Sequence, residues 1–409
     1  MDIVIVAQYL GDLEHLEKTN GRFMYLGGML SEKNEVEIVT TTFIHARKCQ
    51  AKHIPDSFKD CKITPLHEPG YPKNVCLRRF VSHHKLSLNI KEYLYQRKKP
   101  DIIYVAVPAL SVALEAAKYC QRKNVRLIVD VQDLWPEAFK MVFHVPLLSN
   151  MVFYPMKKQA DRIYALADEI IAVSQTYADR ALSVNQRCQE VAVVYLGTDK
   201  HVFDECAKVH MSLNVKKKTI WEEMSDGSEE DITRLVYVGT LGHSYDISVV
   251  LAALRELSND EIKKVKFIVI GDGPKRKQFE QEAVGLPVIF TGLIPYTEMV
   301  WLLCRCDIAI NPIKKGAAQS IINKHMDYAM AGLPVINTQE CMEYRNLLEK
   351  YSCGINCQCE NENSVARAIK YFMENENIQK EMGERHRKMA EELFDRRRSY
   401  LKILDIIEQ

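Results

Sequence analysis

The sequence predicts an α/β fold with two domains, each built on a parallel β-sheet. Short runs rich in Val and Ile alternate with longer helical or loop segments, and this alternation occurs twice along the chain. The runs are apolar throughout, as expected for strands that helices cover on both faces. The chain has 409 residues and exceeds the size at which single cores stop growing. We therefore expect two domains of roughly 200 residues each.

The expected strands follow one another in a regular order. In the first half they are IVIVAQY, EVEIVTT, DIIYVAV, RLIVDV and EIIAVS, and in the second half RLVYVG, KFIVIG, VIFTG, DIAINP and PVINT. We place an N-terminal domain at residues 1–200, a C-terminal domain at 201–385 and a charged C-terminal helix at 386–409. The polar segment 208–231 contains KKK and DGSEED, which is typical of a surface insertion near the linker.

Composition and charge argue against several classes of protein. The formal net charge of +1 argues against a nucleic-acid binder that relies on a large basic surface, although it leaves a local basic patch open. The chain leads directly into the strand IVIVA, so we expect no signal peptide, and no apolar run approaches the roughly 20 residues that span a bilayer. These features predict a cytoplasmic protein. Of the 12 cysteines, only Cys353, Cys357 and Cys359 form a tight group, and we expect free thiols there rather than a metal site.

The stretch SIINKHMDYAMAGLPV, residues 320–335, is the most informative part of the chain. It has the pattern of a helix that stops at Gly332, after a strand and a basic, glycine-containing loop. On this helix Asn323 and Asp327 lie one turn apart, with Lys324 beside them. The free N–H groups of the first turn, the helix dipole and the lysine favour an anion, and a carboxylate further along can accept hydrogen bonds from a ribose diol. The pattern predicts a site for a nucleoside diphosphate.

The same stretch resembles the donor-binding motif of the retaining GT-B glycosyltransferases of family 4. In that motif two acidic residues, with seven residues between them, precede an Ala-Met-Ala-x-Gly-x-Pro-Val tail, and this chain has YAMAGLPV after Asp327. The second acidic position falls on Asp327 and the first on Gln319. The resemblance implies that Asp327 holds the ribose hydroxyls. It places Gln319 near the transferred sugar, where an amide can form hydrogen bonds but cannot carry charge.

Polar residues and a tryptophan follow the strand RLIVDV of the first domain, in the segment QDLWPE. They offer polar groups and a sugar-stacking surface at the carboxyl end of a strand. The alternative is a turn in which Asp133 caps a helix begun by Trp135-Pro136, and both interpretations can hold. The segment is similar to the D-x-Q-D-x-W-P-E signature of family 4 members that build bacterial capsular and O-antigen polysaccharides. The Gln132 amide cannot usefully exchange a proton, so Asp133 is the best candidate for acceptor contact, and Gln132, Asp133 and Gln319 are the candidate catalytic residues.

Glycine-containing loops after other strands complete the expected donor site. Gly21 and Arg22 open a helix in a loop that matches the family's first loop, which closes on the donor diphosphate. Thr240 and His243 stand where the family usually places an arginine and a lysine, although a histidine in such a loop is more often a surface residue. The turns after KFIVIG and VIFTG match two family turns that flank the nucleotide base. The candidate donor-binding residues are Gly21, Arg22, Gly239, Thr240, His243, Gly273, Ile294, Asn323, Lys324 and Asp327.

The resemblance covers nearly the whole chain and implies the GT-B fold, with two Rossmann-like domains facing a deep interdomain cleft. The N-terminal domain is then the acceptor side, and the C-terminal helix packs back on it. The implied activity is a hexosyltransferase that moves a sugar, with retention, from a nucleotide-diphosphate donor such as a UDP-sugar. The implied acceptor is a saccharide or polyprenyl-diphosphate saccharide of surface polysaccharide biosynthesis, and no metal or other cofactor is implied.

Two other functions stay open at this point. A sugar-nucleotide epimerase of the GT-B fold would bind the same nucleotide, but it needs acid and base groups that Gln132 and Gln319 cannot supply. A catalytically silent subunit that only binds a nucleotide sugar is motivated by the same two residues. Nucleotide release that requires an acceptor separates the transferase from both.

Two stretches of the first domain predict attachment to the inner face of the cytoplasmic membrane. Residues 73–85, KNVCLRRFVSHHK, interleave basic and apolar side chains, and residues 141–158, MVFHVPLLSNMVFYPMKK, end in two lysines. Basic residues near an anionic leaflet contribute on the order of 1 kcal/mol each, and apolar neighbours add shallow insertion. The alternative is that 73–85 is a solvated loop and 141–158 a buried helix pair.

Overall fold

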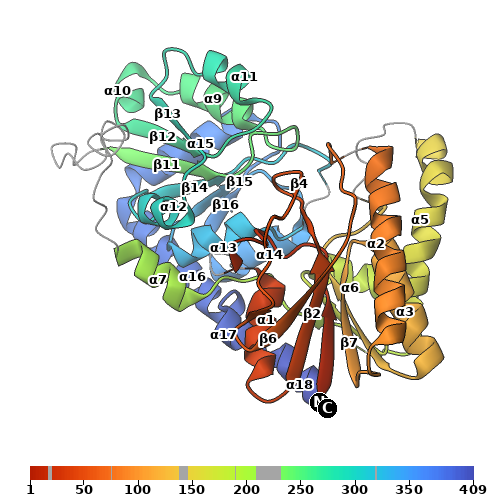
Figure 1. The fold of residues 1–409 in the computed structure, drawn as a ribbon. Helices are drawn as coiled ribbons and strands as arrows, with labels where there is room; N and C mark the ends of the chain where they lie inside the picture. Colours follow the sequence, from red (N-terminus) through yellow and green to blue (C-terminus); the bar gives the residue numbers. More distant parts are fainter. Residues whose placement is uncertain (17–20, 75, 138–145, 189, 209–231, 318–319) are drawn as a thin grey trace. The chain divides into compact units, whose positions relative to one another are not determined.

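The computed structural model describes residues 1–16, 21–74, 76–137, 146–188, 190–208, 232–317 and 320–409 (Figure 1). The chain forms two compact units. Unit 1 consists of Met1–Tyr195 and Tyr400–Gln409, and unit 2 of Leu196–Ser399. Each unit is an α/β layer structure with its own sheet and its own apolar core.

Unit 1 is built on an eight-stranded sheet with the order β10-β9-β8-β7-β1-β2-β6-β5. Neighbouring strands are parallel except for β5, which pairs antiparallel with β6. The strands are β1 (Asp2–Val6), β2 (Glu35–Thr41), β5 (Ser57–Phe58), β6 (Cys61–Leu66), β7 (Ile102–Val107), β8 (Arg126–Val131), β9 (Glu169–Ala172) and β10 (Ala192–Val193), and β3 (Phe43–Ile44) pairs separately with β4 (Cys49–Gln50).

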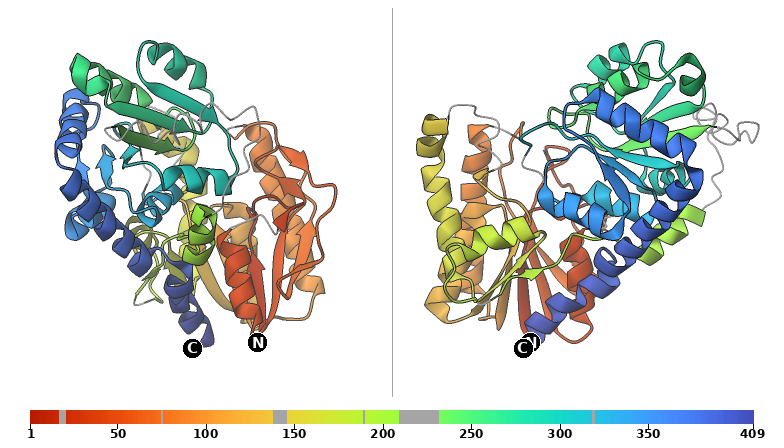
Figure 2. Two further views of the ribbon diagram at one scale, coloured as in Figure 1. Left: turned by 90° about the vertical axis from the view of Figure 1, so that its left-hand side faces the viewer. Right: turned by 180° about the vertical axis from the view of Figure 1, so that it is seen from behind.

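Helices cover both faces of this sheet, as the apolar strand sequences predict (Figure 1). One face carries α1 (Arg22–Ser31) and α18 (Leu401–Glu408), and the other carries α2 (Leu77–Gln96), α3 (Leu110–Lys123) and α5 (Pro146–Leu166). Helix α6 (Gln175–Leu182) lies between β9 and β10 in the sequence. Tyr400, Ile403 and Ile407 join the core of unit 1 beneath α1, so the last residues of the chain pack with the first domain's sheet. Figure 2 shows the two chain termini at the same end of that sheet.

Unit 2 is built on a six-stranded sheet with the order β13-β12-β11-β14-β15-β16, and all of its neighbouring strands are parallel. The strands are β11 (Thr233–Val238), β12 (Val265–Ile270), β13 (Val288–Gly292), β14 (Ile308–Asn311), β15 (Val335–Asn337) and β16 (Gly354–Asn356). β11 is the first strand of unit 2 along the chain and lies between β12 and β14 in the middle of the sheet. The strand order reverses there. Ligands bind beyond the carboxyl ends of such sheets, at the switch in strand order.

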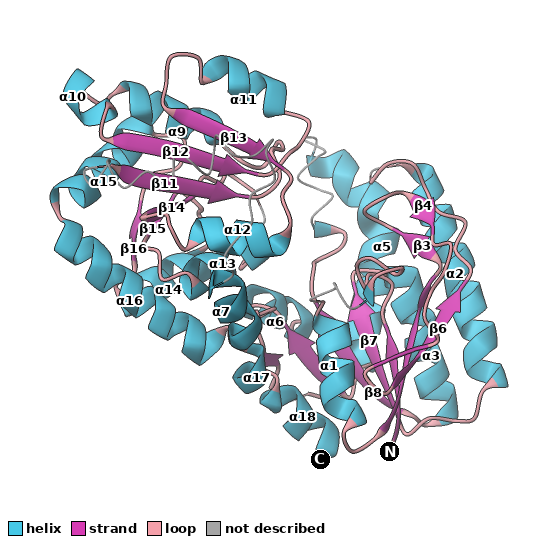
Figure 3. Ribbon diagram, turned by 60° about the vertical axis from the view of Figure 1, so that its left-hand side comes forward, coloured by secondary structure: helices cyan, strands magenta, loops and turns pink. Residues whose placement is uncertain are grey.

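The helices of unit 2 also form two layers (Figure 3). One layer consists of α9 (Ile247–Arg255), α11 (Arg276–Glu282) and α15 (Glu362–Glu374), and the other of α12 (Tyr296–Leu303), α13 (Asn323–Met330), α14 (Met342–Tyr351) and α16 (Glu376–Leu393). The remaining helices are α7 (Lys200–Lys208), α10 (Asn259–Ile262) and α17 (Arg396–Ser399). None of the described helices is long and apolar enough to cross a bilayer.

Candidate functional site

The turns after β11 and β12 pack backbone against backbone at the carboxyl edge of the unit 2 sheet. Gly239 and Gly271 have φ values of +146° and +136°, and a Cβ atom on Gly271 would lie 1.9 Å from the Gly239 carbonyl oxygen. A Cβ atom on Gly273 would lie 2.4 Å from the Leu241 carbonyl oxygen. The structure thus brings the predicted residues Gly239 and Gly273 into neighbouring turns, and only glycine fits these contacts. Thr240, on the first of these turns, is exposed.

Lys324 points its amine at the first of these turns. Its side chain is buried, and its Nζ atom lies 4.1 Å from the ring centroid of Tyr237 and 3.8 Å from that of Tyr245. A Cβ atom on Gly239 would lie 2.7 Å from this Nζ atom, so the amine nearly touches the turn. Among the described residues it has no hydrogen-bond partner, and burial lowers the pKa of Lys324 well below its usual value. The two ring faces attract a cation, but an anion is the partner that this amine lacks.

Asp327 lies about one turn further along α13, where it accepts a hydrogen bond from a tyrosine. The Tyr296 hydroxyl donates to Asp327 Oδ1 over 3.1 Å, and the Thr198 hydroxyl lies 3.2 Å from the same tyrosine oxygen. Burial raises the pKa of Asp327 to about 7, against the opposing effects of the Tyr296 hydrogen bond and the Arg396 charge. Ile294 is half-buried in the loop that leads into Tyr296 and α12. A perturbed carboxylate and an unpaired amine on one short helix are typical of a binding site.

Other predicted residues of unit 2 lie at the surface or outside the described residues. Asn323 is the first residue of α13, and its side chain is exposed. His243 is also exposed, on the loop between β11 and α9. Gln319 lies outside the described residues. The side chains that this part of the structure brings toward one another are therefore those of Lys324, Tyr237 and Tyr245, and those of Asp327 and Tyr296.

A ladder of three asparagines, two of them fully buried, lies at the carboxyl ends of β14, β15 and β16, and sequence reasoning missed it. Asn311, Asn337 and Asn356 end three adjacent parallel strands in register. Asn311 Nδ2 donates to Asn337 Oδ1 over 2.8 Å, and Asn337 Nδ2 donates to Asn356 Oδ1 over 2.9 Å. Gln339 Nε2 donates to the Ser320 carbonyl oxygen over 2.8 Å, which fixes the chain just before the helix. The signal was present in the strand ends IAIN, VIN and GIN.

Arg22, which the sequence suggested as a phosphate contact, has a structural partner in unit 1. Its Nε atom lies 2.7 Å from Asp130 Oδ2, and both side chains are buried. The same guanidinium donates to the carbonyl oxygens of Val194 and Tyr195, over 3.0 and 3.1 Å. Gly21 precedes α1 in an extended conformation, with φ −83°. The ion pair explains the presence of an arginine at the start of α1, and the predicted role of both residues in donor binding stays a prediction.

Gln132 and Asp133 follow β8, as predicted, and both are half-buried. The Asp133 carboxylate accepts hydrogen bonds from the Leu134 backbone N–H over 2.9 Å and from Trp135 Nε1 over 3.2 Å. Burial raises the pKa of Asp133, and these hydrogen bonds oppose the rise. The Gln132 amide nitrogen has no partner among the described residues. The Asp133 carboxylate therefore holds the loop that contains Trp135. The helix that we expected to begin at Trp135-Pro136 falls largely on residues that the structure does not describe.

Next to Asp133, unit 1 contains a pocket of about 310 Å³ at the carboxyl ends of β1, β2, β7 and β8. We call it the Arg79 pocket. Its lining residues come from five separated parts of the chain: Gln8, Tyr9, Leu10, Gly11, Leu13, Phe43, His45, Ala46, Arg79, Pro108, Asp133 and Trp135. Sequence reasoning found only Asp133 and Trp135 among them. Pro108 directly follows the expected strand DIIYVAV, so a search beyond every strand end would have found it, whereas the expected strand IVIVAQY included Gln8 and Tyr9.

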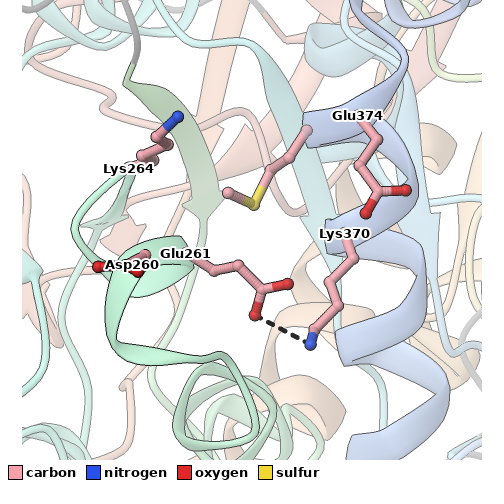
Figure 4. Close-up of a pocket in the computed structure, with 6 residues that line it drawn as sticks. Asp260, Glu261, Lys264, Lys370 and Glu374 are labelled. Atoms are coloured by element: carbon pink, nitrogen blue, oxygen red, sulfur yellow. Dashed lines mark ion pairs between the residues drawn. The ribbon is translucent and has the colours of Figure 1, made fainter.

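A second pocket, in unit 2, is lined by none of the candidate site residues named above. Figure 4 shows it between α10 and α15, with an ion pair of 2.9 Å between Lys370 Nζ and Glu261 Oε2. Lys264 lines this pocket and directly precedes β12, so the pocket lies at the amino end of that strand. Its volume is about 240 Å³. Its charged side chains include both signs, and the described residues contain no cluster of His, Cys, Asp or Glu that could hold a metal ion. All 12 cysteines are free thiols.

A family model and a curated relative each match a part of this chain in sequence. Residues 220–389 match the family described as Glycosyl transferases group 1. The chain is 21% identical over 198 residues to a Campylobacter jejuni protein, a match that covers 47% of this chain and 53% of that one. That protein is named GalNAc-α-(1→4)-GalNAc-α-(1→3)-diNAcBac-PP-undecaprenol α-1,4-N-acetyl-D-galactosaminyltransferase. The chain spans about half the length of the curated relatives that it matches.

Solved structures resemble the chain over its whole length. HepE of Anabaena in complex with UDP superposes with a TM-score of 0.69 at 15% identity, covering 100% of both chains. Sucrose-phosphate synthase of Thermosynechococcus elongatus superposes with a TM-score of 0.72 at 15% identity, covering 100% of this chain and 99% of the other. At such identity the likeness shows the fold alone. The predicted GT-B fold, with two Rossmann-like domains, is confirmed.

Proposed function

We propose that the protein is a glycosyltransferase that moves a sugar from a UDP-sugar to a saccharide acceptor. The observation that carries this proposal is the buried, unpaired Lys324 amine beside the Gly239 turn, with Asp327 about one turn along the same helix. A diphosphate supplies the anion that the amine lacks, and a ribose supplies hydroxyl donors for the carboxylate. The match of residues 220–389 to Glycosyl transferases group 1, and the UDP complex of a protein of the same fold, support this assignment.

The main chemical demand of such a reaction is to stabilise the departing diphosphate. We propose that Lys324 and the N-terminus of α13 supply the positive field, without a resident metal or other cofactor. On this proposal the acceptor hydroxyl attacks the anomeric carbon on the face that the diphosphate leaves, and the bond from that carbon to the diphosphate oxygen breaks. The leaving phosphate takes up the hydroxyl proton, and configuration is retained. A protein base is then not required, which suits the amides of Gln132 and Gln319.

A panel of nucleotide sugars tests the proposal directly. We expect UDP release from a UDP-sugar to require a lipid-linked saccharide acceptor such as the undecaprenol-linked type in the Campylobacter jejuni relative's name. Conversion of the sugar nucleotide without an acceptor would indicate an epimerase instead. Tight UDP binding with no transfer to any acceptor would indicate a silent binding subunit. Failure to bind any nucleotide would contradict all three functions.

We further propose that unit 1 attaches to the inner face of the cytoplasmic membrane through α2 and α5. Residues 77–85 are helical and belong to α2, so the alternative of a solvated loop is wrong for that part. Leu77 is 84% exposed and Met151, on α5, is 75% exposed, so the second stretch is not a fully buried helix pair. Both helices begin near the carboxyl ends of the strands and flank α3 on one face of the sheet (Figure 1). Exposed apolar side chains beside Arg78 and Lys158 suit an anionic leaflet.

Flotation with liposomes checks this proposal. We expect the protein to float with anionic vesicles at low salt and to be released by high salt, because the basic residues contribute an electrostatic part to the binding. The double variant Leu77→Gln and Met151→Gln should lose most of the floating fraction. Val284→Gln, at a valine of unit 2 that is 73% exposed, is the matched control and should float like the wild type. Equal binding to neutral and anionic vesicles would contradict the electrostatic part, and no flotation at low salt would contradict the whole proposal.

A further inference from the structure

The Arg79 guanidinium is held in place by neutral groups. Arg79 is 8% exposed, and its two terminal nitrogens donate to the Asn74 carbonyl oxygen over 2.8 Å and to the Tyr9 hydroxyl over 3.0 Å. Its central carbon lies 4.5 Å from the Trp135 ring and 5.4 Å from the Tyr71 ring. Its Nε atom has no hydrogen-bond partner among the described residues. An oriented guanidinium therefore lines the Arg79 pocket, and its Nε–H donates to no group of the described residues.

Other arginines with little exposure in unit 1 have a carboxylate partner, which makes Arg79 an exception. Their ion pairs are Arg22 with Asp130 at 2.7 Å, Arg97 with Asp2 at 2.8 Å, and Arg180 with Glu137 at 2.7 Å. Within the described part of the chain, Arg79 makes no ion pair. Burying a guanidinium without a counter-charge is unfavourable, because the lost hydration is not replaced by an ionic contact. An anionic ligand at the guanidinium would replace part of that lost interaction.

Asp133, which lines the pocket, and Glu68, which binds the lining residue Gln8, both form hydrogen bonds with other groups. Glu68 is fully buried, and its oxygens accept hydrogen bonds from Gln8 Nε2, the Thr41 hydroxyl and the Ser82 hydroxyl, at 2.7 to 2.9 Å. Asp133 accepts from Leu134 and Trp135 as described above. Neither carboxylate forms an ion pair with Arg79 in the described structure, although the Arg79 charge opposes the rise that burial causes in the pKa of Asp133. Arg79 therefore has no directly paired counter-charge among the described residues.

Burial, together with nearby positive charges, keeps two histidines near the pocket neutral. Burial, followed by the charges of Lys48 and Arg79, lowers the pKa of His45 to about 4. Burial and the Arg79 charge, with a smaller effect of His45, lower the pKa of His83 to about 3. No carboxylate of the described residues offsets these charges at either imidazole. Both histidines are therefore neutral near pH 7 and add no positive charge to those of Arg79 and Lys48.

We infer that the Arg79 pocket binds a sugar unit that carries a carboxylate or a phosphate group, and that Arg79 pairs with that group. The rings of Tyr9, Phe43 and Trp135 provide an apolar wall of the kind on which a sugar ring stacks. A volume of about 310 Å³ lies at the small end of the range for ligand pockets and suits one or two sugar rings. That this sugar belongs to the acceptor rests on the proposed function, whereas its binding in the pocket does not.

Titration with small sugars tests the inference on the full-length protein saturated with UDP. The probes are glucuronate, glucose 6-phosphate and glucose, followed by ligand-observed NMR. We expect at least one anionic probe to bind about tenfold or more tightly than glucose, because a charge-assisted contact to guanidinium is added. Preference for glucuronate alone points to a uronic acid, and preference for glucose 6-phosphate alone points to a phosphorylated sugar. If Lys324→Met shows the same preference for the anionic probe, the probe does not bind at the Lys324 site of unit 2.

Substitutions of basic residues test which side chain causes the preference for the anionic probe over glucose. Arg79→Gln should remove the preference for the anionic probe, and Arg79→Lys should restore part of it. Because Arg79 also supports Tyr9 and Trp135, Lys48→Gln provides a second test that leaves those contacts in place, and it should reduce the preference by a smaller factor. Arg47→Gln is the matched control, since Arg47 is exposed and already paired with Asp12 and Glu14.

The outcomes separate this inference from the proposed function. Binding of glucose as tight as that of the anionic probes, binding of no probe at all, or an unchanged preference in folded Arg79→Gln would overturn it. UDP binding measured on the same samples reports on the donor site of unit 2. A protein that binds UDP but shows no anion preference contradicts only the inference, and one that prefers anionic sugars but binds no nucleotide contradicts only the proposed function.

Discussion

Replacing Lys324 with methionine is expected to stabilise the empty protein and to remove most of its affinity for UDP. In the empty site the amine is buried without a hydrogen-bond partner among the described residues, which is unfavourable for folding. Methionine fills the space between the Tyr237 and Tyr245 rings without a charge, and we expect a gain of about 1 to 3 kcal/mol in the free energy of unfolding. Loss of a desolvated charge partner should weaken UDP binding by about 2 to 5 kcal/mol.

The pH dependence of the stability gain identifies its cause. The pKa of Lys324 is lowered by burial in the folded protein, so below its usual value of 10.5 the unfolded chain binds a proton that the folded chain holds weakly. This difference destabilises the wild type at neutral pH and disappears as the pH rises toward 10.5. The stability advantage of Lys324→Met should therefore shrink with rising pH. Denaturant unfolding across this range measures it.

Calorimetry with UDP and with uridine measures the binding part of the prediction. Lys324→Met, like Lys324→Ala, should impair UDP binding far more than uridine binding, because the amine faces the diphosphate. Lys277→Met is the matched control at an exposed lysine of the same unit, and we expect it to change stability by no more than about 0.5 kcal/mol. A Lys324→Met protein that is less stable than the wild type, or that loses affinity equally for both ligands, would show that the lysine has a structural role instead.

The fold was predictable because its signal is local. Strands such as Arg126–Val131 and Val265–Ile270 are buried on both faces, and this produces the continuous apolar runs that the sequence shows. The helix at Asn323–Met330 was predictable for a similar reason, since its glycine stop and the one-turn spacing of Asn323 and Asp327 are properties of a short segment. The pairing of Gly239 with Gly271 could be expected only in outline, because the close approach of two backbones depends on strands that are distant in sequence.

The side-chain partners were not predictable, because they join residues far apart in the chain. Arg22 follows a glycine at a helix start, which suggested a phosphate contact, but its partner Asp130 lies 108 positions later. Arg79 looked like part of a basic stretch, and its burial follows from the packing of α2 against the loops after β1 and β8. The asparagine ladder needs the register of β14, β15 and β16, which no single strand specifies. Local patterns define elements, whereas tertiary contacts decide which charges stay unpaired.

Raising the pH through neutrality is expected to strengthen uridine binding, because Asp327 must be ionised to accept two ribose hydroxyls. Burial raises the pKa of Asp327 to about 7, so the ionised fraction increases about tenfold between pH 6 and pH 8. The affinity for uridine should rise by about the same factor over that interval. Uridine is the suitable ligand because it has no phosphate that titrates in this range. The affinity for 2′,3′-dideoxyuridine, which lacks the diol, should stay constant.

Variants of the hydrogen-bonded pair give the sharpest form of this prediction. Asp327→Asn should weaken uridine binding at pH 8 by about 1 to 3 kcal/mol and remove the pH dependence. It should also stabilise the empty protein at pH 8, because a carboxyl with a raised pKa contributes stability at low pH that is lost as the pH rises through that value. Tyr296→Phe removes a hydrogen bond that lowers the pKa of Asp327, so the midpoint of the binding curve should move to higher pH. Asp260→Asn changes an exposed carboxylate of unit 2 and should leave the curve unchanged. Uridine affinity that is independent of pH in the wild type, or identical in folded Asp327→Asn, would remove Asp327 from the ribose site.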